Sequence, residues 1–264
     1  MSIFSDKKII PILVITGGSV LLLISFGIRH SFGLYLIPIS EYLESGRELF
    51  SFASALNVLM IGIGSPIFGA LSDRYGSGRA AVLGILMVIS SLFWMANVQG
   101  GFDIIISQTI FGFGCAGCGT AVVLGAVGRS VQQTNRTLAL GVVMAAGSFG
   151  QFIMVPAISY LIQIFGWSQS LIILAFIGLL MIVFSFFMNY SQKSESSKAG
   201  TTQSIKEAIV EAFKSKSFNL LSLGFFVCGF HVTFVAVHLP AFVNDQNLPF
   251  WVGGWALAFI GIFN

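Results

Sequence analysis

The feature that most constrains this chain is a succession of apolar segments, each long enough to cross a lipid bilayer. A transmembrane helix needs about 20 consecutive, mostly apolar residues to span the hydrocarbon core. Seven such segments follow one another, at residues 10–37, 50–71, 80–97, 104–127, 138–164, 168–188 and 218–242. An eighth begins at Trp251 and reaches the end of the sequence at Asn264, which is too short to cross. The pattern predicts an all-α membrane protein.

The composition agrees with lipid as the main solvent. Only 9% of the residues are charged and 56% are hydrophobic. A soluble domain needs roughly 25% charged residues to cover its surface. We therefore expect the lipid bilayer to surround most of the chain, and we expect no nucleic acid among its partners.

The spacing of the segments predicts three regions. Residues 1–190 would form a six-helix transmembrane bundle, residues 191–215 a polar linker, and residues 216–264 the incomplete start of a second bundle. The linker turns amphipathic near its end, where three apolar residues recur every fourth position, at Ile205, Ile209 and Phe213. This spacing predicts a short helix lying on the membrane surface.

The placement of basic residues predicts the orientation of the chain. If every segment crosses the membrane, eleven of the 13 Lys and Arg residues lie on one side: Lys7, Lys8, Arg74, Arg79, Arg129, Arg136, Lys193, Lys198, Lys206, Lys214 and Lys216. The opposite side has only Arg47, and Arg29 lies within the first segment. Basic residues accumulate in cytoplasmic loops, so the N-terminus and the linker are predicted to be cytoplasmic.

The three cysteines, Cys115, Cys118 and Cys228, all lie inside apolar segments. The first two have the C-x-x-C spacing of redox and zinc sites. Neither a second ligand pair nor flanking charge accompanies them, so packing of small residues in a glycine-rich helix is the favoured interpretation. The neighbouring glycines at positions 112, 114, 117 and 119 are likewise interpreted as packing residues. We expect no metal and no other cofactor.

The sharpest motif joins the second and third segments and reads Gly69-Ala-Leu-Ser-Asp73-Arg74-Tyr75-Gly76-Ser-Gly78-Arg79. Gly69 would let a neighbouring helix approach, and the two later glycines would permit the backbone angles of a tight turn. Asp73 could pair with Arg79 or face the positive N-terminal end of another helix. An ordinary turn with cytoplasmic basic residues remains the alternative.

This segment resembles the signature of the major facilitator superfamily between helices 2 and 3, Gly-x-Leu-x-Asp-Arg-x-Gly-x-x-Arg, with every fixed position present. The resemblance implies two six-helix halves, with the substrate site at their interface. It implies a gating role for the motif, in which Asp73 and Arg79 lock and release, supported by Gly69, Arg74 and Gly76. It also implies that a C-terminal half, which this sequence lacks, would complete the transporter.

Other segments resemble the monocarboxylate-porter-like branch of that superfamily, namely residues 27–35, residues 140–156 and the turn at residues 165–167. Residues 228–234 resemble bacterial members of that branch more than animal members. The resemblance implies secondary active transport of a small organic anion such as a monocarboxylate, with a proton as coupling ion, in the bacterial inner membrane. That branch often has a carboxylate and an arginine in helix 8, and residues 251–264 contain neither.

Arg29 is the strongest candidate for binding such an anion. A cation within a membrane helix is costly unless it faces protein or water, and a guanidinium can bind a carboxylate through two parallel hydrogen bonds. The alternative is that Arg29 extends to the outer interface. His30 is the next candidate, but adjacent residues point about 100° apart on a helix, so only one of the two is expected to line a cavity.

Three further polar residues lie within the apolar segments. His231 could carry a proton, because histidine titrates near neutral pH, or could be a hydrogen-bonded packing residue. Asn57 and Gln151 could orient a substrate, although hydrogen bonding between helices is their more common role.

Other functions on this fold stay open, including antiport or export of another small solute, and a transport-inactive sensor or assembly factor. An enzyme would need paired acids, a metal-spaced cluster or a nucleophile with its base at depth. The sequence has none of these patterns, and we predict that the protein is not an enzyme.

Overall fold

The computed structural model describes residues 9–190 and 205–263, and these residues form helices and short connections without a β-strand. The elements are α1 (Ile9–His30), η2 (Phe32–Tyr35), α2 (Leu36–Tyr42), α3 (Arg47–Tyr75), α4 (Ser77–Ala96), α5 (Gly101–Cys118), α6 (Thr120–Ser130), η3 (Gln133–Asn135), α7 (Arg136–Ser185), η4 (Phe186–Tyr190), α8 (Ile205–Lys214), α9 (Lys216–Asp245) and α10 (Phe250–Phe263).

The first predicted segment is one span made of two helices. α1 ends at His30, and the chain continues through the single turn η2 into α2, which extends to Tyr42. Ser31 lies at the break, and its hydroxyl donates to the carbonyl of Ile28 at 2.7 Å. Within η2, Gly33 lies against the backbone carbonyl of Ala236 in α9, where a Cβ would clash. The missing side chain therefore lets the backbones of η2 and α9 meet.

The fourth predicted segment is interrupted. α5 ends at Cys118 and α6 begins at Thr120, because Gly119 between them has an extended backbone (φ −92°, ψ −165°). The crossing predicted at residues 104–127 is present as one span, Gly101–Ser130, with this interruption inside it. The fourth span is thus discontinuous, an arrangement that transporters use around binding sites, whereas the first tightens into one 3-10 turn and stays helical.

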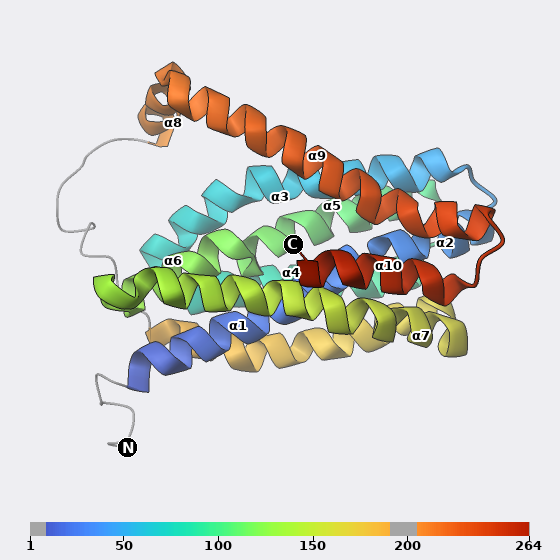
Figure 1. Cartoon of the computed structure of the whole chain (residues 1–264), viewed down its shortest axis with the longest axis horizontal. Helices are drawn as coiled ribbons and strands as arrows, with labels where there is room; N and C mark the ends of the chain where they lie inside the picture. Colours follow the sequence, from blue (N-terminus) through green and yellow to red (C-terminus); the bar gives the residue numbers. More distant parts are fainter. Residues whose placement is uncertain (1–8, 191–204, 264) are drawn as a thin grey trace.

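The fifth and sixth predicted segments form the single element α7, which reverses at Gly166. A straight helix of 50 residues would extend about 75 Å, more than twice the hydrocarbon core of about 30 Å. Gly166 has φ +80° and ψ 167°, a conformation open almost only to glycine, and the chain folds back there (Figure 1). The turn predicted at residues 165–167 is confirmed.

The crossings alternate between two ends of the bundle. We name the α2 end after the helix Leu36–Tyr42 and the α8 end after the helix Ile205–Lys214, both of which Figure 1 shows. The turn at Gly166 and the connection from α9 to α10 lie at the α2 end. The predicted side with most basic residues corresponds to the α8 end, where the described part of the chain has Arg74, Arg79, Arg129, Arg136 and Lys214.

Close helix crossings come from glycines. In α4 and α5, Gly84 lies against the backbone of Gly114 and Gly117, and a Cβ on any of the three would meet backbone within 3 Å. Gly112 lies against the backbone of Asn57 in α3, where a Cβ would again clash. The packing interpretation of these α5 glycines is therefore confirmed, whereas Gly119 marks the break between α5 and α6.

α9 and α10 pack on the first six crossings mainly near the α2 end. α9 contacts η2 and α2 there, and α10 packs along α7. Gln151 of α7 donates to the carbonyl of Leu257 in α10 at 2.8 Å. Most of the remaining surface of α9 is exposed. The C-terminal segment is thus anchored to the bundle at one end.

Candidate functional site

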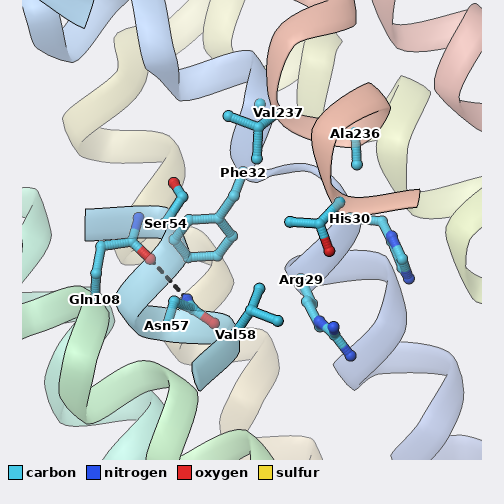
Figure 2. A pocket seen from close by; sticks show the side chains of 11 residues that line it. Arg29, His30, Phe32, Ser54, Asn57, Val58, Gln108, Ala236 and Val237 are labelled. Atoms are coloured by element: carbon cyan, nitrogen blue, oxygen red, sulfur yellow. Dashed lines mark hydrogen bonds between the residues drawn. The ribbon is translucent and has the colours of Figure 1, made fainter. Parts of the chain in front are cut away.

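A small cavity with both polar and apolar walls lies between the first bundle and α9. Its volume is about 40 Å³. Five elements supply its walls, α1, η2, α3, α5 and α9, through Arg29, His30, Phe32, Gly33, Ser54, Asn57, Val58, Gln108, Thr233, Ala236 and Val237 (Figure 2). We call it the Arg29 cavity. It brings together residues from the two groups of helices that the sequence separates by the linker.

Arg29 borders two cavities at once. Besides the Arg29 cavity, it lines a second space of about 30 Å³ with Ser25, Phe26, Ile61, Ser65, Cys115, Ala116, Gly119 and Thr120. No side chain in the described part of the chain forms a hydrogen bond or ion pair with its guanidinium. The structure therefore places this cation inside the bundle, beside the break at Gly119 in the fourth span, and not at the α2 end of the protein.

His30 also lines the Arg29 cavity, so the expectation that only one of the two neighbours would do so was wrong. Its ring contacts Phe26 edge-on, with 5.8 Å between ring centroids. Both residues lie in the last turn of α1, where adjacent side chains point about 100° apart, but this spacing does not keep both from reaching one cavity. The long side chain of Arg29 reaches between the two cavities, which lets both residues border the first.

Asn57 and Gln108 form a polar pair on the wall formed by α3 and α5. The amide nitrogen of Asn57 donates to Gln108 Oε1 at 2.7 Å (Figure 2), and Gln108 Nε2 points to Met95 Sδ at 3.7 Å. Asn57 is 6% exposed and Gln108 is fully buried. Asn57 thus makes the interhelical hydrogen bond considered as its alternative role, and it also lines the cavity.

Two predicted binding residues lie elsewhere. Gln151 is buried and binds the backbone of α10, as described above, away from the walls of the Arg29 cavity. His231 is exposed on α9. It lines neither of the two cavities that Arg29 borders, nor the larger cavity between α3 and α9 that is described below. A third histidine, His238, packs against Phe234 at 4.8 Å between ring centroids. The structure therefore brings together Arg29, His30 and Asn57, but not Gln151 or His231.

The motif between α3 and α4 is held together by a residue outside it. Arg129, near the end of α6, forms an ion pair with Asp73 at 2.8 Å and donates to the hydroxyls of Ser77 at 2.8 Å and Ser72 at 3.3 Å. Pairing of Asp73 with Arg79, one of the two roles considered for Asp73, was wrong, because Arg79 is exposed and forms no hydrogen bond or ion pair with another described residue.

Only one of the three glycines of the motif has the role expected of it. Gly76 has φ +100° and makes the turn, as predicted. Gly78 lies inside α4, and its missing side chain makes room for Asn189 and the carbonyl of Ser185. A Cβ on Gly69 would meet no atom within 4 Å among the described residues, so no helix approaches it there. Arg74 lies over the ring of Tyr75, 5.4 Å from its centroid.

Sequence reasoning missed Ser54, Gln108 and Thr233, all of which line the Arg29 cavity. Gln108 had a usable signal, since it is a lone carboxamide inside an apolar span. Serine and threonine are common in membrane helices and usually bond to their own backbone, so the other two carried no signal.

A larger apolar cavity of about 690 Å³ separates α3 from α9. Its walls include Leu59, Ile63, Phe226 and Phe230, together with Ser54 and Thr233, which also line the Arg29 cavity. The two cavities therefore adjoin, and the larger one extends along α9 toward the α8 end.

Cys115 and Cys118 are buried free thiols that do not form a disulfide with each other. The thiol of Cys118 donates to the carbonyl of Gly114 at 3.6 Å and lies 3.9 Å from the hydroxyl of Ser25. These contacts agree with the packing interpretation.

An all-helical membrane bundle with a discontinuous span and a cavity between two helix groups is an arrangement found in membrane transport proteins. The model of the Major Facilitator Superfamily matches residues 15–264, and the chain belongs to that family. Monocarboxylate transporter 11 of Mus musculus is 25% identical over 241 residues, covering 90% of this chain and 52% of the relative. MFS-type transporter pytF of Aspergillus terreus is 24% identical over 259 residues, covering 96% of this chain and 83% of the relative.

A solved structure supports the same fold. The crystal structure of a D-xylose-proton symporter superposes with a TM-score of 0.67 at 13% identity, covering 97% of this chain and 66% of the symporter. The chain spans about half the length of Monocarboxylate transporter 11 from mouse or human.

Proposed function

We propose that this protein takes part in secondary active transport of a small organic anion, such as a monocarboxylate, by alternating access with a proton as coupling ion. One observation carries the proposal: Arg29 is a cation inside the bundle, it borders a small cavity that other polar side chains also line, and no described side chain pairs with it. A cation at this depth is costly without a counter-charge. A bound anion would supply one.

The size and chemistry of the cavity support a small carboxylate. A space that holds one water needs roughly 10–15 Å³ on the same measure, so about 40 Å³ accommodates a ligand of a few heavy atoms. A guanidinium offers a carboxylate two parallel hydrogen bonds. The described cavity walls contain no Asp or Glu, so no negatively charged side chain there repels an anion. The name of the mouse relative agrees with this substrate class.

The contacts of α9 support alternating access. Near the α2 end, η2 and α9 touch through Gly33 and Ala236, whereas further along α9 the apolar cavity separates it from α3. The Arg29 cavity is thus covered on one side and adjoins a wide space on the other. If the α8 end is cytoplasmic, as its basic residues suggest, this arrangement faces inward. We infer that the N-terminus and linker lie in the bacterial cytoplasm.

The gate of this transport cycle would include the motif between α3 and α4. The ion pair of Asp73 with Arg129 joins α3 to α6 at the α8 end. Gly76 makes the turn between α3 and α4. We propose that this ion pair, with Arg74 and Arg79 exposed beside it, rearranges when the α8 end closes.

Uptake of radiolabelled lactate or pyruvate into proteoliposomes tests the proposal. The protein, as its source expresses it, is assayed with and without a pH gradient that drives protons into the proteoliposomes. Arg29→Gln should lower uptake at least about tenfold, because it removes the only cation on the cavity wall in the described structure, while Arg29→Lys should retain part of it. Lys216→Gln, which removes an exposed charge, is the matched control. Equal uptake by wild type and Arg29→Gln would contradict the proposal.

A further inference from the structure

The orientation of the Asn57 side chain is fixed by its neighbours. Gln108 turns its amide nitrogen to the sulfur of Met95, which can only accept a hydrogen bond, so its oxygen faces Asn57. Asn57 must present its own nitrogen to that oxygen. Its Oδ1 is therefore directed away from Gln108 and accepts no hydrogen bond from the described residues (Figure 2). The cavity wall thus offers a fixed acceptor.

Ser54, one turn earlier on α3, has an unpaired hydroxyl. Its side chain is 6% exposed, and its Oγ has no hydrogen-bond partner among the described residues. Two other serines of α3 bond to their own helix: Ser51 donates to the carbonyl of Arg47, and Ser65 to that of Ile61, at 2.8 and 2.7 Å. A buried hydroxyl without a partner needs an explanation, and a ligand in the cavity supplies one.

We propose that Ser54 and Asn57, held by Gln108, form a subsite for a hydroxyl group on the transported anion. The inference rests on the proposed function, in which Arg29 binds the carboxylate. The cavity of about 40 Å³ is small enough for one ligand to meet Arg29 and this subsite together. The substrate class is then a small hydroxycarboxylate.

The acceptor on Asn57 decides between hydroxylated and other anions. A plain carboxylate, or one with a keto group, carries no donor for Oδ1 and leaves it unpaired on binding. An ammonium group is a donor, but the described cavity walls have no carboxylate to balance it beside Arg29. A hydroxyl satisfies both groups, because it donates to Asn57 and accepts from Ser54.

Four probes of similar size separate these chemistries: lactate, propionate, pyruvate and alanine. In proteoliposomes of the wild-type protein, we expect lactate to be taken up, or to compete, at least about tenfold better than propionate, pyruvate or alanine. In the double variant Asn57→Leu with Ser54→Ala, the ratio of lactate uptake to propionate uptake should fall to near one, while propionate uptake is retained. Ser54→Thr keeps the hydroxyl and should preserve the ratio. Ser90→Ala, at an exposed serine bonded to its own helix, is the control.

The outcomes separate this inference from the proposed function. Equal handling of lactate and propionate by wild type, with both lost in Arg29→Gln, overturns the hydroxyl subsite and leaves the anion site standing. Uptake that does not depend on Arg29 overturns both. If the double variant fails to fold, the binding of lactate and propionate to purified wild type, measured by thermal shift, still decides, and equal affinities overturn the subsite.

Discussion

Arg47 and Asp245 form two parallel hydrogen bonds of 2.7 Å between guanidinium and carboxylate. The first residue of α3 and the last residue of α9 are thereby joined at the α2 end, across 198 positions of sequence. Their side chains are 50% and 45% exposed, so the ion pair is screened by salt and contributes modestly to stability. Its position makes it a contact that must break if α9 moves away from α3 at this end.

Breaking this ion pair should expose the Arg29 cavity from the α2 end. We expect Asp245→Asn to increase labelling of Thr233→Cys by a membrane-impermeant maleimide several-fold, because one of the contacts between α3 and α9 is lost. The background carries Cys228→Ser, since Cys228 is exposed. The exchange of both charges, Arg47→Asp with Asp245→Arg, should restore slow labelling. Equal labelling in all three proteins would contradict this role.

Arg129 should matter more for stability than Arg79. Arg129 is 20% exposed on its side chain and binds three partners, whereas Arg79 forms no hydrogen bond or ion pair with a described residue. Arg129→Gln should lower the free energy of unfolding by about 1–3 kcal/mol, and Arg79→Gln by less than about 0.5 kcal/mol. Thermal unfolding in detergent measures both. Equal losses would favour the pairing of Asp73 with Arg79 after all.

Gly112 should not tolerate a methyl group. A Cβ there overlaps the backbone of Asn57, so α3 and α5 must move apart, at a cost of about 1–3 kcal/mol. Gly141→Ala is the matched control, because a Cβ at Gly141 meets nothing within 4 Å and alanine favours a helix. We expect a lower unfolding temperature for Gly112→Ala and an unchanged or slightly higher one for Gly141→Ala. Similar shifts in both variants would argue against this close crossing.

His30 and His231 should differ in their effect on substrate affinity. His30 lines the Arg29 cavity and His231 does not, so His30→Gln should raise the concentration for half-maximal uptake several-fold, while His231→Gln should leave it unchanged. Concentration series in proteoliposomes measure this quantity. An effect on affinity at His231 alone would place the substrate elsewhere and revive the prediction that this histidine binds it.

The apolar segments determined the number and order of the crossings, because the length needed to span a bilayer is a local property of the chain. Glycine at positions 76 and 166 also marked two turns, since a positive φ is a local requirement that few other residues meet. Arg29 was identifiable from sequence for a similar reason: a cation inside an apolar span is conspicuous.

Only the tertiary structure decided which residues meet. Asp73 pairs with Arg129 and not with the nearer Arg79, and Arg47 with Asp245, because helices far apart in sequence pack side by side. Ser54, Asn57 and Gln108 line the same cavity as Arg29, because glycine at position 112 lets α5 reach the backbone of α3. Side-chain partners across a bundle depend on such close approaches, and no local pattern of residues encodes them.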